Sequence, residues 1–155
     1  MILDCPPSLG LLTLNALVAA DEVLLPIQCE YYALEGVTQL MRTIEAVRHA
    51  MNKELRLGSI LMTMFDGRTR LSTQVDEEVR THFARETMST RIPRSVRVSE
   101  APSYSRSVLT YEPTSAGAVA YREAAAEFAK RHACDEHSTN TSGVKHPDAS
   151  DTKKG

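Results

Sequence analysis

At 155 residues, the chain is long enough for one domain with a real core and too short for two comfortable ones. A net charge of −2 and 42% hydrophobic residues are ordinary for a soluble globular protein, so nucleic-acid binding would require a local basic patch. Three widely spaced cysteines without a CxxC pair argue against a disulfide framework or a metal site and favour a reducing compartment. No stretch approaches the ~18 apolar residues of a membrane span, and no signal peptide precedes the first apolar run, so we expect a cytoplasmic protein.

Apolar runs alternate with helical patterns along the first third of the chain. The stretch Ile2–Asp4 indicates the end of a buried strand that carries a carboxylate. A very apolar helix over Leu11–Val18 follows, which we expect to be buried on most sides. The branched apolar run Val23–Cys29 is typical of a buried parallel strand. Apolar residues spaced by three and four over Leu34–Met51 predict one face of a long helix.

The rest of the chain continues this alternation. The patterns predict a strand at Ser59–Phe65 ended by an Asp66-Gly67 turn, a helix at Leu71–Phe83, a short strand at Thr90–Pro93, an irregular segment with Pro102, a short strand at Val108–Tyr111 and a last helix from about Ser115 to Lys130. Strands that alternate with helices predict an α/β fold, a parallel sheet with crossover helices. Ligands of such sheets bind at the carboxyl ends of the strands.

The composition changes after residue 132. From Ala133 to Gly155, Val144 is the one large apolar residue, so this segment cannot bury enough surface to offset the entropy of ordering it. We therefore expect a domain over residues 1–132 and a disordered polar tail over residues 133–155.

Four motifs carry a resemblance to a known family. They are DCPPSLGLLTLNAL at the start, PIQCEYYALEG at Pro26–Gly36, LMTMFDGRT at Leu61–Thr69 and IPRSVRVSEAP at Ile92–Pro102. Together they resemble the ParA/Soj family, the deviant-Walker ATPases of chromosome and plasmid partitioning, from residue 1 to about residue 131. The resemblance implies a P-loop NTPase-like fold that binds ATP and Mg²⁺. It also implies dimers that coat DNA non-specifically, with a ParB-like partner that stimulates hydrolysis.

The resemblance implies a nucleotide site with two parts. Asp4 corresponds to the Walker B carboxylate, which holds Mg²⁺ through a bound water molecule. The alternative for Asp4 is an acid that caps a turn before a helix. Thr63, Met64 and Pro93 match the rim that packs around the adenine base, although Met64 is equally well explained as core.

The resemblance also implies a DNA-binding surface. Arg68 and Arg97 match the DNA-contacting arginines of the family, and Arg70, Arg94 and Arg106 are candidates to extend the patch. Guanidinium groups bind phosphates bidentately, and non-specific affinity follows the number of phosphates neutralised. The alternative is a scatter of solvated surface charge.

The phosphate loop of the family has no counterpart in the sequence. The family carries a KGGxGKT-type loop before its Walker B strand, whereas this chain contains no Gly-Lys dipeptide. We therefore expect a partial P-loop NTPase-like sheet without the P-loop strand, and little or no ATPase activity of this chain alone. The expected partners are DNA, a ParB-like protein and a second copy or an intact ParA, at the nucleoid. An ATP-independent DNA- or partner-binding module and an inactive remnant are the alternatives. Membrane binding is disfavoured because the tail lacks a basic amphipathic helix.

Overall fold

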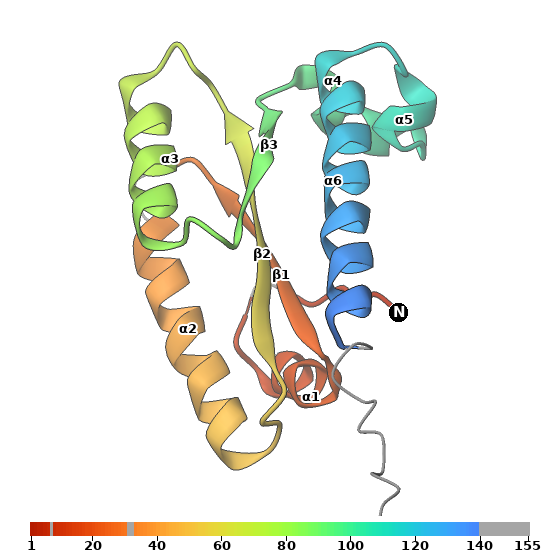
Figure 1. Cartoon of the computed structure of the whole chain (residues 1–155). Helices are drawn as coiled ribbons and strands as arrows, with labels where there is room; N and C mark the ends of the chain where they lie inside the picture. Colours follow the sequence, from red (N-terminus) through yellow and green to blue (C-terminus); the bar gives the residue numbers. More distant parts are fainter. Residues whose placement is uncertain (7, 31–32, 140–155) are drawn as a thin grey trace, which may run out of the picture.

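The computed structural model describes residues 1–6, 8–30 and 33–139. Within this part of the chain, three parallel strands form one sheet in the order β1-β2-β3 (Figure 1). The elements, in chain order, are α1 (Leu11–Ala19), β1 (Glu22–Gln28), α2 (Ala33–Ala50), β2 (Arg56–Phe65), α3 (Arg70–His82), β3 (Thr87–Pro93), α4 (Val96–Glu100), the 3₁₀ helix η1 (Ala101–Tyr104), α5 (Val108–Tyr111) and α6 (Ala116–Thr139). The α/β fold with parallel strands and crossover helices is thereby confirmed.

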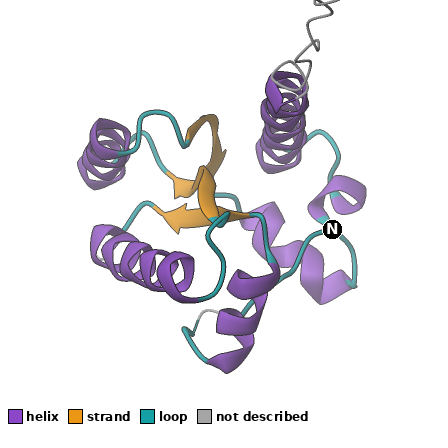
Figure 2. Cartoon of the chain, turned by 60° about the horizontal axis from the view of Figure 1, so that its bottom comes forward, coloured by secondary structure: helices purple, strands orange, loops and turns teal. Residues whose placement is uncertain are grey.

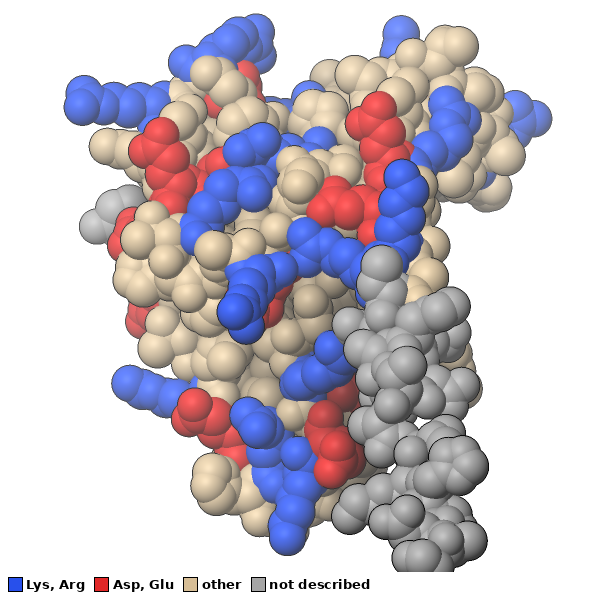
Figure 3. Space-filling model, viewed as in Figure 1, with Lys and Arg blue, Asp and Glu red and all other residues tan. Residues whose placement is uncertain are grey.

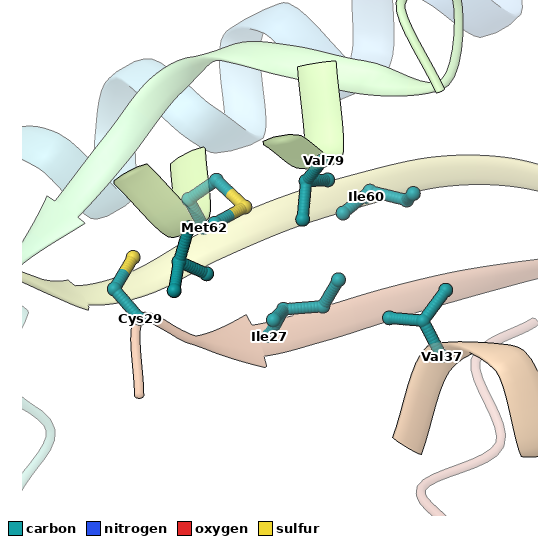
Figure 4. Close-up of a cluster of buried hydrophobic side chains, with 7 residues drawn as sticks. Ile27, Cys29, Val37, Ile60, Met62 and Val79 are labelled. Carbon is teal, nitrogen blue, oxygen red and sulfur yellow. The ribbon is translucent and has the colours of Figure 1, made fainter. Parts of the chain in front are cut away.

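Helices α2 and α3 cover one face of the sheet, and α6 lies on the other (Figure 2). The first face is apolar because alternate side chains of a strand point to the same side. Ile27 of β1 and Ile60 and Met62 of β2 pack there against Val37 of α2 and Val79 of α3 (Figure 4). Ile60, Met62 and Val79 are fully buried, so this cluster is the centre of the core.

The opposite face packs against α6 through small side chains. Leu61 of β2 and Met88 and Ile92 of β3 contact Ala120 and Ala124 of α6. Alanines at these positions let the helix backbone approach the strands closely. Since Leu61 lies between Ile60 and Met62 in sequence, the apolar run of β2 serves both faces, as expected of a central parallel strand.

Helix α1 is less buried than its composition suggests. Leu17 packs against Ile44 of α2, whereas Leu11 and Leu12 are 78% and 73% exposed. The expectation of burial on most sides is therefore wrong, since the described residues cover one face of this helix. Asn52 secures its end, because its side-chain amide donates to the backbone oxygens of Val18 (3.0 Å) and Ala20 (2.8 Å).

The two edges of the sheet differ. The outer edge of β3 is covered by α6, whose Glu127 carboxylate accepts hydrogen bonds from the backbone N–H groups of Ser89 (2.7 Å) and Thr90 (2.8 Å). No described strand lies beside the outer edge of β1. Pro26 of β1 has no N–H to donate, which suits an edge strand.

Two predicted strands are wrong. Ile2–Asp4 forms no strand and pairs with none of the described strands, so Ile2 is 88% exposed. Val108–Tyr111 forms the short helix α5, in which Val108 alone is buried.

The boundaries of three other elements differ from the predicted ones by three residues or more. β2 begins at Arg56 rather than at Ser59, and β3 begins at Thr87 rather than at Thr90. α6 ends at Thr139 rather than at about Lys130, and residues 140–155 of the predicted tail lie outside the described residues. No helix in the described ranges is both long enough and apolar enough to cross a membrane.

Candidate functional site

The carboxyl ends of β2 and β3 lie side by side and form one rim of the sheet. Phe65 is the register partner of Pro93, and the backbone N–H of Arg94 donates to the Phe65 carbonyl oxygen at 3.0 Å. Thr63 and Met64, at the end of β2, are half-buried, as is Pro93. The structure therefore brings together the three residues that the sequence assigned to an adenine rim.

The backbone at Met64 has an unusual conformation. Its φ angle is 53°, in the left-handed region that costs a residue with a side chain about 1–2 kcal/mol. The register between β2 and β3 shifts at the same place, between Met62 and Phe65. The hydroxyl of Thr63 donates to the Ile27 carbonyl oxygen at 3.0 Å and ties this bend to β1. Strained backbone that is held in this way is common at ligand-binding edges.

The turn that follows β2 presents Arg68. The Asp66 carboxylate accepts hydrogen bonds from the backbone N–H of Arg68 (3.1 Å) and from its guanidinium Nε (3.0 Å) and Nη2 (2.9 Å). The guanidinium lowers the pKa of Asp66 from its ordinary value of 3.8 to about 2. Thr69 then caps α3 by accepting from the Ser72 N–H. The Arg68 side chain stays 90% exposed, so it can contact a large polyanion.

The segment after β3 presents the other candidate arginines. Arg94 Nη2 donates to Glu30 at 3.4 Å, and Arg97 Nη1 of α4 donates to Glu100 at 3.0 Å. Arg94 also lies near enough to Asp66 to help lower its pKa, which joins the strand ends into one charged surface. In Figure 3, basic and acidic side chains are interspersed over this upper part of the molecule.

The two remaining candidates lie beside these segments. Arg70 is the first residue of α3, and Arg106 follows η1, where its backbone N–H donates to the Ala101 carbonyl oxygen at 3.2 Å. Both residues are exposed, as are Arg68, Arg94 and Arg97. None of the five arginines is therefore part of the core.

Asp4 does not occupy a strand end. It is exposed and belongs to no strand, so the predicted strand that ends at Asp4 is wrong. Within the described ranges, no three His, Cys, Asp or Glu residues come together in a way that could hold a metal ion. The described residues therefore do not offer a set of ligands for Mg²⁺, and we derive no hydrolysis step from them.

Sequence reasoning missed an ionic network behind the rim. Asp76 of α3 is 4% exposed and binds both Arg80 and Arg91. The i,i+4 spacing of Asp76 and Arg80 is visible in the sequence, whereas the pairing with Arg91 needs the folded chain. Arg91 also stacks over the Phe65 ring, 5.3 Å from its centroid, so the network supports the end of β2.

The cysteine beside this network, Cys29, is 3% exposed and packs in the core. Burial is the main reason that the pKa of the Cys29 thiol rises from 9.0 to about 11. The thiol therefore stays protonated at neutral pH and packs as a small apolar side chain.

Comparisons with known proteins identify relatives of this chain. The family model of an AAA domain matches residues 1–57. The sporulation initiation inhibitor protein Soj of Bacillus subtilis is 51% identical over 129 residues, which are 83% of this chain and 51% of that protein. The chromosome-partitioning ATPase Soj of Thermus thermophilus is 53% identical over 84% of this chain and 53% of its own length. The chromosome partitioning protein ParA of Myxococcus xanthus is 50% identical over 84% of this chain and 46% of its own length.

Solved structures agree on the fold. The crystal structure of cobyrinic acid a,c-diamide synthase from Mycobacterium smegmatis with bound ADP and magnesium has a TM-score of 0.59 and 40% sequence identity. That match covers 77% of this chain and 42% of the synthase. Residues 7 and 31–32, within two of the four motifs, lie outside the described residues. At about 50% identity over the matched residues, the chain belongs to the ParA/Soj family of chromosome partitioning proteins, and it spans about half the length of the curated relatives it matches.

Proposed function

We propose that this chain acts in DNA partitioning by binding double-stranded DNA non-specifically through its rim arginines. The observation that carries the proposal is the exposure of Arg68 and Arg97 beside the adjoining carboxyl ends of β2 and β3, in a relative of chromosome partitioning proteins. Arg70, Arg94 and Arg106 extend the surface. Association with the nucleoid follows from this binding.

The chemistry of the surface suits phosphates rather than bases. A guanidinium group offers a planar fork of donors that matches a phosphate, and it stays charged at every physiological pH. The net charge of the chain is −2, so attraction to DNA must come from these local groups. Their affinity should fall steeply as salt rises, because each phosphate contact releases condensed counterions.

A nucleotide has a limited role in this function of the chain. We propose that Thr63, Met64 and Pro93, which are half-buried, contact an adenine base, whereas Asp4 enters only through the family resemblance, because it lies on no strand. No described residues cradle a triphosphate, so we propose that this chain alone does not hydrolyse ATP. A ParB-like protein and a second copy or an intact ParA are the partners that the family suggests.

Fluorescence anisotropy with a labelled duplex of random sequence tests the DNA contacts. Arg68→Ala and Arg97→Ala should each weaken binding, and each should lower the slope of log K against log salt by about 0.9. Arg48→Ala on α2 is the matched control, since it removes one exposed arginine away from the rim. Equal losses for Arg48→Ala and Arg68→Ala, or binding that ignores salt, would reject the proposal.

A second candidate function is a DNA-binding module that needs no ATP. It rests on the same exposed arginines and requires no nucleotide site in this chain. The same anisotropy measurement with and without ATP and Mg²⁺ separates the two cases. Unchanged affinity supports the module, and a large gain with ATP and Mg²⁺ contradicts it.

A further inference from the structure

Three of the rim arginines are already bound by carboxylates of the same chain. The N–O distances are 2.9 Å between Arg68 and Asp66, 3.4 Å between Arg94 and Glu30, and 3.0 Å between Arg97 and Glu100. The candidate DNA-binding surface therefore carries much less free positive charge than its arginines alone would give. Acidic side chains lie among the basic ones over this part of the surface (Figure 3).

The three pairs differ in geometry. Asp66 binds two nitrogens of the Arg68 guanidinium and the backbone N–H of the same residue, so it shapes the turn that presents Arg68. Glu30 and Glu100 each accept one hydrogen bond from the guanidinium group of their arginine. Asp66 is therefore a structural partner, whereas the two glutamates neutralise charge without shaping the backbone.

The two glutamate pairs are open to water. The Arg94 and Glu30 side chains are 59% and 56% exposed, and those of Arg97 and Glu100 are 55% and 40% exposed. Exposed ion pairs of this kind contribute only about 0–1 kcal/mol, so an incoming phosphate can replace either glutamate at low cost. A phosphate also offers the arginine a bidentate contact, which the glutamate does not make here.

We propose that Glu100 and Glu30 compete with DNA phosphates for Arg97 and Arg94 and thereby set the strength and salt dependence of DNA binding. This inference rests on the proposed DNA contacts. When phosphate takes the arginine, the released carboxylate is left without its partner and attracts a cation from solution. That uptake cancels part of the counterion release from DNA, so wild-type binding is weaker and less salt-dependent than its arginines would allow.

The test measures how tightly the full chain binds the random-sequence duplex when one charged glutamate is replaced by neutral glutamine. Glu100→Gln should tighten binding about threefold, the effect of one unit charge at about 6 Å in water. It should also steepen the salt slope by up to about 0.9. Glu30→Gln should act in the same direction. Glu45→Gln is the matched control, because Glu45 is an exposed glutamate in the second half of α2, which ends at the opposite end of the molecule (Figure 1).

The double variant Arg97→Ala/Glu100→Gln shows whether Glu100 affects DNA binding through Arg97. If Glu100 acts by holding Arg97, the gain from Glu100→Gln disappears when Arg97 is already absent. A gain that persists in the Arg97→Ala background, or an equal gain from Glu45→Gln, reduces the effect to bulk charge and overturns the inference. No change or weaker binding of Glu100→Gln overturns it as well.

The same measurements distinguish a failure of this inference from a failure of the proposed DNA binding. If wild type binds and Arg97→Ala weakens binding while Glu100→Gln changes nothing, the DNA contacts stand and this inference alone falls. If no variant binds the duplex at low salt, both fall. Circular dichroism of each variant checks that the helices are retained.

Discussion

The Asp76 carboxylate of α3 accepts two hydrogen bonds from Arg91 of β3, at 2.9 Å from Nε and 2.6 Å from Nη2. Arg80 Nε, one turn further along α3, lies 3.0 Å from the same carboxylate. Asp76 is 4% exposed, whereas both guanidinium groups reach water. One buried carboxylate, balanced by two cations, therefore joins α3 to β3.

Asp76→Ala should destabilise the fold by about 1–3 kcal/mol, since it removes the acceptor that two partly buried guanidinium groups share and leaves Arg80 with the Met88 carbonyl oxygen at 2.9 Å. Asp76→Asn, which keeps the shape and one acceptor oxygen, should cost less. Glu77→Ala removes an exposed acid from the same turn of α3 and should stay within about 0.5 kcal/mol of wild type. Urea unfolding measures all three, and equal free energies of unfolding for Asp76→Ala and Glu77→Ala would contradict this role of Asp76.

The loss of stability at acidic pH should depend on Glu127 of α6, which binds the backbone of β3. Burial alone would raise the pKa of Glu127, but hydrogen bonds from Ser89, Thr90 and Arg131 outweigh it and lower the pKa from 4.5 to about 2. Because the folded pKa is lowered, the stabilisation is present above pH 4.5 and is lost as the pH falls from 4.5 towards 2.

Glu127→Gln should therefore lower the free energy of unfolding by about 1–2 kcal/mol near neutral pH. The gap between this variant and wild type should narrow as the pH falls to about 3.5. Urea unfolding at both pH values measures the gap. A gap of the same size at both would show that the ionised carboxylate is not what holds the β3 edge.

Much of this fold was predictable from the sequence because its strands and helices carry long periodic patterns. The run Val23–Cys29 and the spacing over Leu34–Met51 correspond to β1 and α2. Val108–Tyr111 was mistaken for a strand because four residues are too few to separate a period of two from one of 3.6. Ile2–Asp4 resembled a strand by composition alone, and composition says nothing of the neighbours that a strand needs.

The sequence motifs named the arginines of the candidate site but not the carboxylates that they bind. The motifs pointed to Arg68, Arg94 and Arg97, and the structure places all three beside the strand ends. The partner of Arg94 is Glu30, which lies 64 residues away in sequence. No local pattern reveals such a pair, so the charge of this surface could be judged only from the folded chain.

The contact between His132 of α6 and Glu22 of β1 should make stability fall at alkaline pH. A hydrogen bond from the His132 ring to the Phe128 carbonyl oxygen and the contact with Glu22 raise the pKa of His132 above its ordinary value of 6.5. Because the folded pKa is raised, the stabilisation is complete below pH 6.5 and is lost as the pH rises through the folded value.

His132→Gln should remove this dependence. The difference in free energy of unfolding between wild type and the variant should be below about 1 kcal/mol, since the His132 side chain is 37% exposed. It should be largest near pH 6 and shrink by about pH 8.5. Chemical unfolding of both proteins across this range measures it, and a difference that grows with pH would reverse the sign argued here.

Two glycines in helices should respond oppositely to alanine. A Cβ at Gly36 of α2 would meet nothing within 4 Å, whereas one at Gly117 of α6 would lie 2.5 Å from Val98 Cγ2 and 3.4 Å from Ser95 Cβ. Gly36→Ala should therefore stabilise the protein by up to about 1 kcal/mol, the difference in helix propensity between the two residues. Gly117→Ala gains the same propensity but forces the stiff, β-branched Val98 away, at a cost of about 1–3 kcal/mol. Urea unfolding should thus place the two variants on opposite sides of wild type. Equal stabilisation by both would mean that α4, which carries Arg97, yields freely to α6 and is not held by close packing at Gly117.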